Sequence, residues 1–255
     1  MAIEKKIKES EAAYLSDRFE SGSAEEVLQW TFGEFDDGAA ICTSFQTDGV
    51  VIIDMAHKAG LQPRVFTIDS GRLPEETFEL IDKVRDKYRI DVEVYTPESS
   101  EISEMVTNNG VNLFYGNVTM RMLCCEMRKV KPLNRVLASL DAWVTGLRRD
   151  QSTNRSLTPK IQIDPDHGNI LKVSPLADWS EGDIWRYIHE NDVPFNDLYN
   201  RGYTSIGCAP CTRPIAQGED SRAGRWWWEN GVLKECGIHL TADHIRELID
   251  DRVRD

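Results

Sequence analysis

The chain has 255 residues, of which 40% are hydrophobic and 29% are charged, the balance of an ordinary globular protein. Its formal net charge of −13 argues against a protein that coats nucleic acid or an anionic membrane by bulk electrostatics. The charge is unevenly distributed, since residues 121–160 hold 9 Lys and Arg against 3 Asp and Glu. A local basic pocket for a small anion is therefore compatible with the acidic total.

The first twenty residues are too charged for a secretory signal peptide, and no run of about 18 apolar residues offers a membrane span. We therefore expect a cytoplasmic protein, in which structural disulfides are rare. The six cysteines then indicate metal ligands, reactive thiols or core residues.

Short apolar runs alternate with amphipathic helical patterns along the first 150 residues. The predicted helices are 24–35 (after a Ser23 N-cap), 48–59 and 74–88, and the predicted strands are 39–43, 64–68, 92–95 and 142–145. Strands that alternate with helices predict an α/β fold, with a single open, mainly parallel sheet and helices on both faces.

The last hundred residues follow a different pattern. Two strand-like pieces, 161–164 and 170–173, flank a turn, and a helix is predicted over 180–191 with Ser180 as its N-cap. Beyond Asn191 the chain is rich in glycine and proline, which predicts a loop-rich C-terminal part.

Polar segments follow the first two strands, at the edge where ligands of open α/β sheets bind. The segment SFQTDG, Ser44–Gly49, offers hydroxyls and backbone N–H groups at a helix start, which suits an anion, although an ordinary helix cap explains it as well. Asp69, Gly71 and Arg72 fit either a binding turn or a plain strand-to-helix turn.

Three arginines, Arg148, Arg149 and Arg155, crowd the loop after the fourth strand. They form either a solvated patch or a clamp for phosphate or sulfate oxygens, which the guanidinium fork matches. Their position at a strand end favours the clamp.

Four cysteines form two pairs, Cys124–Cys125 and Cys208–Cys211. Four thiolates suit a structural zinc ion, but adjacent cysteines converge poorly on one ion and reach two corners of a larger cubane cluster more easily. A redox-active CxxC is a third reading, although it does not explain the adjacent pair. Lys129 lies four residues after Cys125, which on a helix places it on the same face, or else it is a solvent-facing lysine.

The other two cysteines stand alone. Cys42 lies in a predicted strand and is expected to be a buried core residue. Cys236, close to Lys234 and His239, is either a thiolate of lowered pKa or an ordinary surface thiol.

The segments SFQTDG, IDSGR, CC with Lys129, GLRRDQS, CxxC and ECGIH occur together between about residues 39 and 240. This combination resembles the assimilatory adenylyl-sulfate (APS) reductases, the iron–sulfur branch of the phosphoadenylyl-sulfate (PAPS) reductase family. The other branch generally lacks the two cysteine pairs. The resemblance implies an adenine nucleotide alpha hydrolase-like fold, with N-terminal helices over 1–38, the nucleotide-binding reductase domain over 39–222 and a catalytic tail over 223–255.

The resemblance also implies a 4Fe-4S cluster on Cys124, Cys125, Cys208 and Cys211, and a catalytic thiol at Cys236. The residues matched to the substrate are Ser44, Phe45, Gln46, Thr47, Asp69, Ser70, Gly71, Arg72, Lys129, Gly146, Arg148, Arg155, Arg222, Arg225 and His239.

The implied reaction is attack of the thiolate on the sulfur of APS, which gives a cysteine S-sulfonate and AMP, and release of sulfite by reduced thioredoxin. A homo-oligomer and a mobile lid carrying the thiol are also expected. SFQTDG and Ser70 depart from the common family pattern, so a PAPS reductase is the alternative within the same fold. A non-catalytic nucleotide- or zinc-binding regulatory protein is the alternative from another class.

Overall fold

A computed structural model describes residues 7–229 and Ile238 of the chain. The contacts among them define two compact units. The first unit holds the residues up to 67 together with 75–94 and 137–197. The second unit holds 68–74, 95–136 and the residues from 198 onward.

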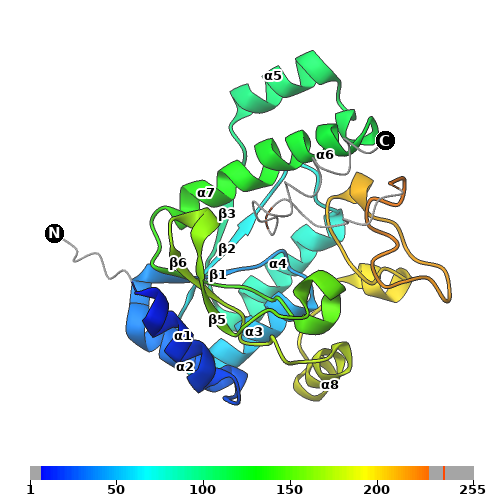
Figure 1. Cartoon of the computed structure of the whole chain (residues 1–255). Coiled ribbons are helices and arrows are strands. Elements are labelled where there is room, and N and C mark those ends of the chain that lie inside the picture. Colours follow the sequence, from blue (N-terminus) through cyan, green and yellow to red (C-terminus); the bar gives the residue numbers. More distant parts are fainter. Residues whose placement is uncertain (1–6, 230–237, 239–255) are drawn as a thin grey trace. The chain divides into compact units, whose positions relative to one another are not determined.

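A six-stranded sheet forms the centre of the first unit, in the order β3-β2-β1-β4-β6-β5 (Figure 1). The strands are β1 (Ala39–Cys42), β2 (Arg64–Ile68), β3 (Val92–Tyr95), β4 (Ala142–Val144), β5 (Ile161–Asp164) and β6 (Ile170–Val173). β1 runs parallel to both β2 and β4, and β4 runs parallel to β6, while β5 and β6 form an antiparallel hairpin. The chain order reverses between β1 and β4, so the carboxyl ends of these two strands mark the switch point where ligands of open sheets bind.

Helices supply the crossovers that parallel strands require. In the first unit, α3 (Thr47–Lys58) connects β1 to β2 and α4 (Glu75–Tyr88) connects β2 to β3. The helices α1 (Glu9–Phe19) and α2 (Ala24–Phe35) precede β1, and α8 (Glu181–Asn191) follows β6. The second unit contains α5 (Ser99–Asn109), α6 (Val118–Cys125), a π-helical stretch over Glu126–Val130 and then α7 (Lys131–Leu137). Short 3₁₀ turns occur at Asp36–Gly38, Leu113–Tyr115, Arg149–Gln151, Thr153–Arg155, Pro165–His167, Asp197–Arg201 and Ala209–Cys211.

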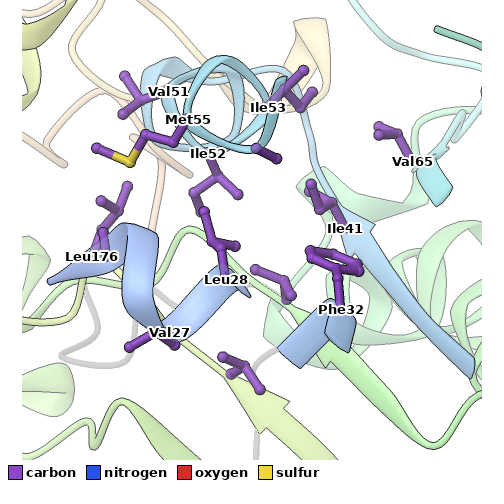
Figure 2. Close-up of a cluster of buried hydrophobic side chains, with 14 of the residues drawn as sticks. Val27, Leu28, Phe32, Ile41, Val51, Ile52, Ile53, Met55, Val65 and Leu176 are labelled. Carbon is purple, nitrogen blue, oxygen red and sulfur yellow. The ribbon is translucent and has the colours of Figure 1, made fainter. Parts of the chain in front are cut away.

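The core of the first unit lies between one face of the sheet and its helices. Figure 2 shows Leu28 of α2 and Ile52 of α3 beside Ile41 of β1, and all three are fully buried. Burial of each such side chain contributes about 1.5–3 kcal/mol. The alternate strand residues Ala40 and Trp143 are equally buried, so both faces of the sheet are covered, as a parallel sheet requires.

Each helix and strand predicted above is present, with its ends within one residue of the predicted ones. The prediction of an α/β fold with a single, mainly parallel sheet is confirmed. α5 and the run from α6 to α7 were not predicted as separate elements. None of the helices in the described part of the chain is long and apolar enough to cross a membrane.

Candidate active site

The predicted anion-binding segment forms a tight turn between β1 and α3 in the first unit. Phe45 is fully buried at a φ of 55°, an uncommon conformation for a residue with a side chain, and its N–H donates to Thr43 Oγ1 over 2.9 Å. α3 begins at Thr47, and the side chain of its N-cap, Gln46, makes no capping hydrogen bond. The first N–H groups of this twelve-residue helix, beside the exposed Ser44, therefore suit an anion.

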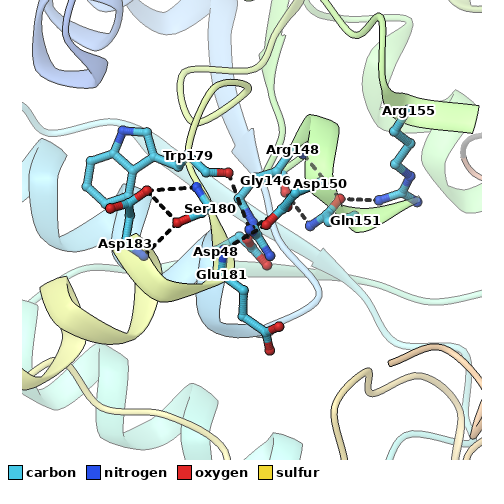
Figure 3. Close-up of polar contacts among 10 residues, drawn as sticks. All are labelled: Asp48, Gly146, Arg148, Asp150, Gln151, Arg155, Trp179, Ser180, Glu181 and Asp183. Atoms are coloured by element: carbon cyan, nitrogen blue, oxygen red, sulfur yellow. Dashed lines mark hydrogen bonds and ion pairs between the residues drawn. The ribbon is translucent and has the colours of Figure 1, made fainter. Parts of the chain in front are cut away.

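The loop after β4 packs closely on the start of α3. A Cβ atom on Gly146 would lie 2.8 Å from Cβ of Asp48, so only glycine permits this approach. Gln151 donates to the carbonyl oxygen of Gly146 over 3.2 Å and accepts from the backbone N–H of Arg148 over 3.1 Å (Figure 3). The loop after β4 is thus stabilised both by its own hydrogen bonds and by packing against α3.

Arg148 lies at the centre of this loop, with its side chain 8% exposed. Its Nε donates to Asp48 and its Nη1 to Asp150, each over 2.5 Å, and Nη1 also reaches the carbonyl oxygen of Trp179 at 3.4 Å (Figure 3). Burial raises the pKa of the Asp48 carboxyl, and the charge of Arg148 opposes that rise.

The other two arginines of this loop have different surroundings. Arg149 forms a two-pronged ion pair with Glu20, at 2.7 and 2.8 Å, and donates to the carbonyl oxygen of Thr158. Arg155 is half-buried and donates to the side-chain oxygen of Gln151. The three side chains therefore do not form one clamp: Arg148 is buried between carboxylates and Arg149 is paired toward α1.

The predicted turn after β2 belongs to the second unit. The backbone N–H of Gly71 donates to Asp69 Oδ1 over 2.7 Å, and Gly71 has a φ of 68°. Arg72 donates to the carbonyl oxygen of Val111 over 2.7 Å and lies 5.2 Å from the ring centre of Phe114. These contacts hold Asp69–Arg72 in a defined turn. Ser70, the fourth residue of this segment that was predicted to bind substrate, is buried in it.

The same unit gathers the cysteines of the two predicted pairs. Cys124, Cys208 and Cys211 belong to one buried cluster with Trp226, while Cys125 is half-buried at the end of α6. Ser70 Oγ lies 3.1 Å from Cys208 Sγ. None of the five cysteines that the structure describes forms a disulfide.

Burial raises the pKa of two of these thiols. The pKa of Cys211 is raised to about 12, chiefly by burial and by Cys208, and the charges of Lys129 and Arg225 oppose the rise. Burial likewise raises the pKa of Cys124, against the influence of Arg128. A positively charged group bound beside these thiols would lower both pKa values.

Basic and aromatic side chains surround this cluster. Arg128 is buried and donates to the carbonyl oxygen of Ser70 over 2.8 Å. Arg225 and Arg121 each lie 4.6 Å from the ring centre of the buried Trp226. Arg222, the remaining predicted residue of this unit, is half-buried in the turn that leads to Arg225.

Within the described part of the second unit, four buried side-chain N–H groups have no hydrogen-bond partner: Arg128 Nε, Arg225 Nε, Trp226 Nε1 and Trp228 Nε1. Such donors suit an anionic group, and the thiol set itself has the chemistry of an iron–sulfur ligand set. No group of three or more His, Cys, Asp or Glu within the described residues is gathered so as to hold a metal ion.

The predicted catalytic Cys236 and the predicted substrate residue His239 lie outside the described residues. Sequence reasoning missed Asp48 and Asp150, which hold Arg148, and Arg128, which contacts the cysteine region. Asp48 stands within the SFQTDG segment and Arg128 beside Lys129, so position alone could have indicated both.

Comparison with known protein families identifies this architecture. Residues 38–214 match the model of the phosphoadenosine phosphosulfate reductase domain, more than half of the chain. The chain belongs to the phosphoadenosine phosphosulfate reductase family.

Relatives in this family support the assignment. The chain is 47% identical over 203 residues to the adenosine 5′-phosphosulfate reductase of Allochromatium vinosum, covering 80% of this chain and 79% of that protein. It is 45% identical over 210 residues to the adenosine 5′-phosphosulfate reductase of Burkholderia cepacia, covering 82% and 84%. The crystal structure of phosphoadenylyl-sulfate reductase from Candida auris in a phosphate complex is similar, with a TM-score of 0.70 and 28% identity, over 81% of this chain and 98% of that one.

Proposed function

We propose that this chain reduces adenylyl sulfate (APS) to sulfite and AMP in assimilatory sulfate reduction, which leads to cysteine. The observation that carries the proposal is its 47% identity, over 80% of the chain, with an adenosine 5′-phosphosulfate reductase. The presence of both cysteine pairs favours APS over PAPS as the substrate.

The first unit supplies groups suited to a nucleotide. The uncapped start of α3 offers backbone N–H groups to a phosphate, and Ser44 and Thr47 offer hydroxyls beside it. Arg155 is our proposed ligand for a phosphate or sulfate oxygen of the substrate from this unit. In the second unit, Asp69–Arg72 and the cations Lys129, Arg222 and Arg225 are the proposed remaining substrate residues.

The proposed chemistry begins with the thiolate of Cys236, carried on the tail over 223–255. It attacks the sulfur of APS, a new S–S bond forms, and the bond from sulfur to the phosphate oxygen breaks, so AMP leaves with the electron pair. A dithiol reductant such as thioredoxin then attacks the sulfur of Cys236 and releases sulfite. Its second thiol closes a disulfide and restores the free thiol of Cys236.

We further propose that Cys124, Cys125, Cys208 and Cys211 hold a 4Fe-4S cluster. These four thiolates would hold the cluster, and the positive charge of its iron would favour their deprotonated form. The unpartnered N–H groups of Arg128, Arg225, Trp226 and Trp228 support an anionic group here. When bound, the cluster would supply a fixed charge beside Lys129.

Thiol exchange of this kind needs a reducing compartment, which supports a cytoplasmic location. Homo-oligomeric assembly remains a prediction. A PAPS reductase is the second candidate, and competition between APS and PAPS in steady-state kinetics separates the two. A strong preference for PAPS would contradict the proposed substrate.

The decisive test is substitution Cys236→Ser. The wild-type protein is incubated without reductant with APS that is radiolabelled in its sulfur. It should release AMP and retain one labelled sulfur per chain. Cys236→Ser should retain none, and Cys42→Ser should behave as the unchanged protein, because Cys42 lies in β1. Stable labelling of Cys236→Ser would show that another residue is the nucleophile.

A further inference from the structure

Arg148 was predicted to bind substrate, but its contacts indicate another role. Its side chain is 8% exposed, and two of its nitrogens already donate to carboxylates, Nε to Asp48 and Nη1 to Asp150. A guanidinium in this arrangement has its charge matched within the protein. An anionic substrate that took over these donors would leave the buried Asp48 carboxyl without its partner, which is costly.

The two carboxylates connect Arg148 to different elements. Asp48 is the second residue of α3, so Arg148 holds the start of the helix whose N–H groups are the proposed phosphate site. Asp150 also accepts from the backbone N–H of Glu181, in the first turn of α8, over 2.7 Å (Figure 3). One side chain thus joins the start of α3, the loop after β4 and the start of α8.

The backbone of Arg148 extends the same arrangement toward Arg155. Its N–H donates to Gln151 Oε1, and this oxygen also accepts from Arg155 (Figure 3). Gln151 therefore places the guanidinium of Arg155 relative to the loop that Arg148 anchors. Gly146, at the start of the same loop, packs directly against Asp48 of α3.

We propose that Arg148 is a positioning residue, which sets the start of α3 and the loop bearing Arg155 in the geometry that binds the substrate's nucleotide part, without touching the substrate itself. This assignment rests on the proposed function, since it presupposes a nucleotide in the first unit. It divides the arginines of one loop by role: Arg148 positions, Arg155 binds, and Arg149 pairs with Glu20.

The test compares binding of AMP with binding of adenosine, measured by competition against labelled AMP. Lysine at position 148 keeps the charge but lacks the planar guanidinium, whose separate nitrogens Nε and Nη1 reach Asp48 and Asp150. Arg148→Lys should weaken AMP and adenosine alike, by about tenfold each, because the whole site is displaced. Arg155→Ala should weaken AMP while leaving adenosine within about twofold, because only AMP carries the phosphate.

Two variants make the comparison secure. Arg149→Ala removes the neighbouring arginine, whose partner is the exposed Glu20, and should leave both affinities unchanged. Asp48→Asn weakens the contact from the other side and keeps the arginine, in case Arg148→Lys fails to fold. It should also weaken AMP and adenosine in parallel, whereas an arginine that bound substrate would be freed and would bind AMP more tightly.

The measurements distinguish a positioning role of Arg148 from a substrate-binding role and from a purely structural one. Loss of AMP affinity alone in Arg148→Lys would make Arg148 a phosphate ligand and overturn the proposal. A lower melting temperature with both affinities unchanged would make its role purely structural and would also overturn it. Absence of AMP binding in the unchanged protein would overturn the proposed function, and this assignment with it.

Discussion

The two units treat their buried charges in different ways. In the first, each of the buried cations Arg148 and Lys160 has a carboxylate partner, Asp48 and Asp178, at 2.5 and 2.8 Å. In the described part of the second, Arg121 is paired with Glu229, but four buried N–H groups lack any acceptor, and two of them belong to the cations Arg128 and Arg225. Among the described residues, the buried cations of the first unit therefore have carboxylate partners, whereas Arg128 and Arg225 of the second keep buried donors that suit an anionic group.

This difference bears on how each region acquires its function. Ion pairs within the protein preorganise the turn between β1 and α3 before a substrate arrives. In the second unit, the raised thiol pKa values and the unpartnered donors agree with the proposed cluster, on which the local arrangement would then depend. The comparison predicts that loss of that group damages one unit and spares the other.

The largest effect is expected from removing a proposed cluster ligand. Cys211→Ser should abolish iron binding and lower the rate of S-sulfonate formation by more than the ~10²-fold that loss of an outer-shell partner costs. Hydrogen exchange should accelerate in α6 and around Cys208, while the amides of β1 and α3 keep their protection. Cys42→Ser, with Cys42 in β1, is the control for loss of a thiol.

Iron analysis decides the matter. Unchanged iron content in Cys211→Ser would contradict the proposed ligand role of Cys211. Equal acceleration of hydrogen exchange in both units would contradict the prediction that only the second unit depends on the cluster.

Much of the fold was predictable because its signals are local. Ser23 and Glu26 form a capping box at the start of α2, and Ser180 and Asp183 form one at the start of α8. Each pair lies within four residues, so the sequence alone shows it. The strands of a parallel sheet are continuous apolar runs, which are equally visible.

The site was less predictable because its contacts are distant in sequence. Arg148 meets Asp48 across 100 residues, and Arg121 meets Glu229 across 108. No periodicity encodes such pairs. The π-helical stretch Glu126–Val130 also changes the spacing assumed for Lys129, which had been counted four residues along an α-helix from Cys125.

A second prediction sharpens the comparison within the second unit. Its one fully buried ion pair among the described residues joins Arg121 and Glu229, with side chains 1% and 7% exposed and 2.7 Å apart. Glu229→Gln leaves a buried guanidinium without its counter-charge and should cost about 3–5 kcal/mol of unfolding free energy. Urea denaturation, followed by a signal of the second unit, measures it.

The matched control makes the same chemical change at an exposed pair. Glu101 and Lys131 are 2.6 Å apart, with side chains 33% and 37% exposed. Glu101→Gln should cost only about 0–1 kcal/mol. Equal costs for the two variants would mean that burial of Arg121 does not set the strength of its pair.

The smallest effect concerns acid sensitivity in the first unit, where the buried Asp164 has two hydrogen-bond partners and one nearby lysine. It accepts from Trp143 Nε1 over 3.1 Å, hydrogen-bonds to His167 over 2.8 Å and lies 4.0 Å from Lys172 Nζ. Burial acts to raise the pKa of Asp164, but His167, Lys172 and Trp143 together hold it below its ordinary value. The stabilisation is therefore complete above the unfolded pKa of about 4 and is lost as pH falls through the lower folded value.

Asp164→Asn should remove this part of the acid dependence, because an amide does not titrate. The wild-type protein should lose more stability than the variant when the pH is lowered from neutrality to about 3. Asp166→Asn, two residues along and exposed, should leave the slope as it is. The slope of unfolding free energy against pH could instead be the same in all three proteins. That result would mean that ionised Asp164 does not stabilise the first unit.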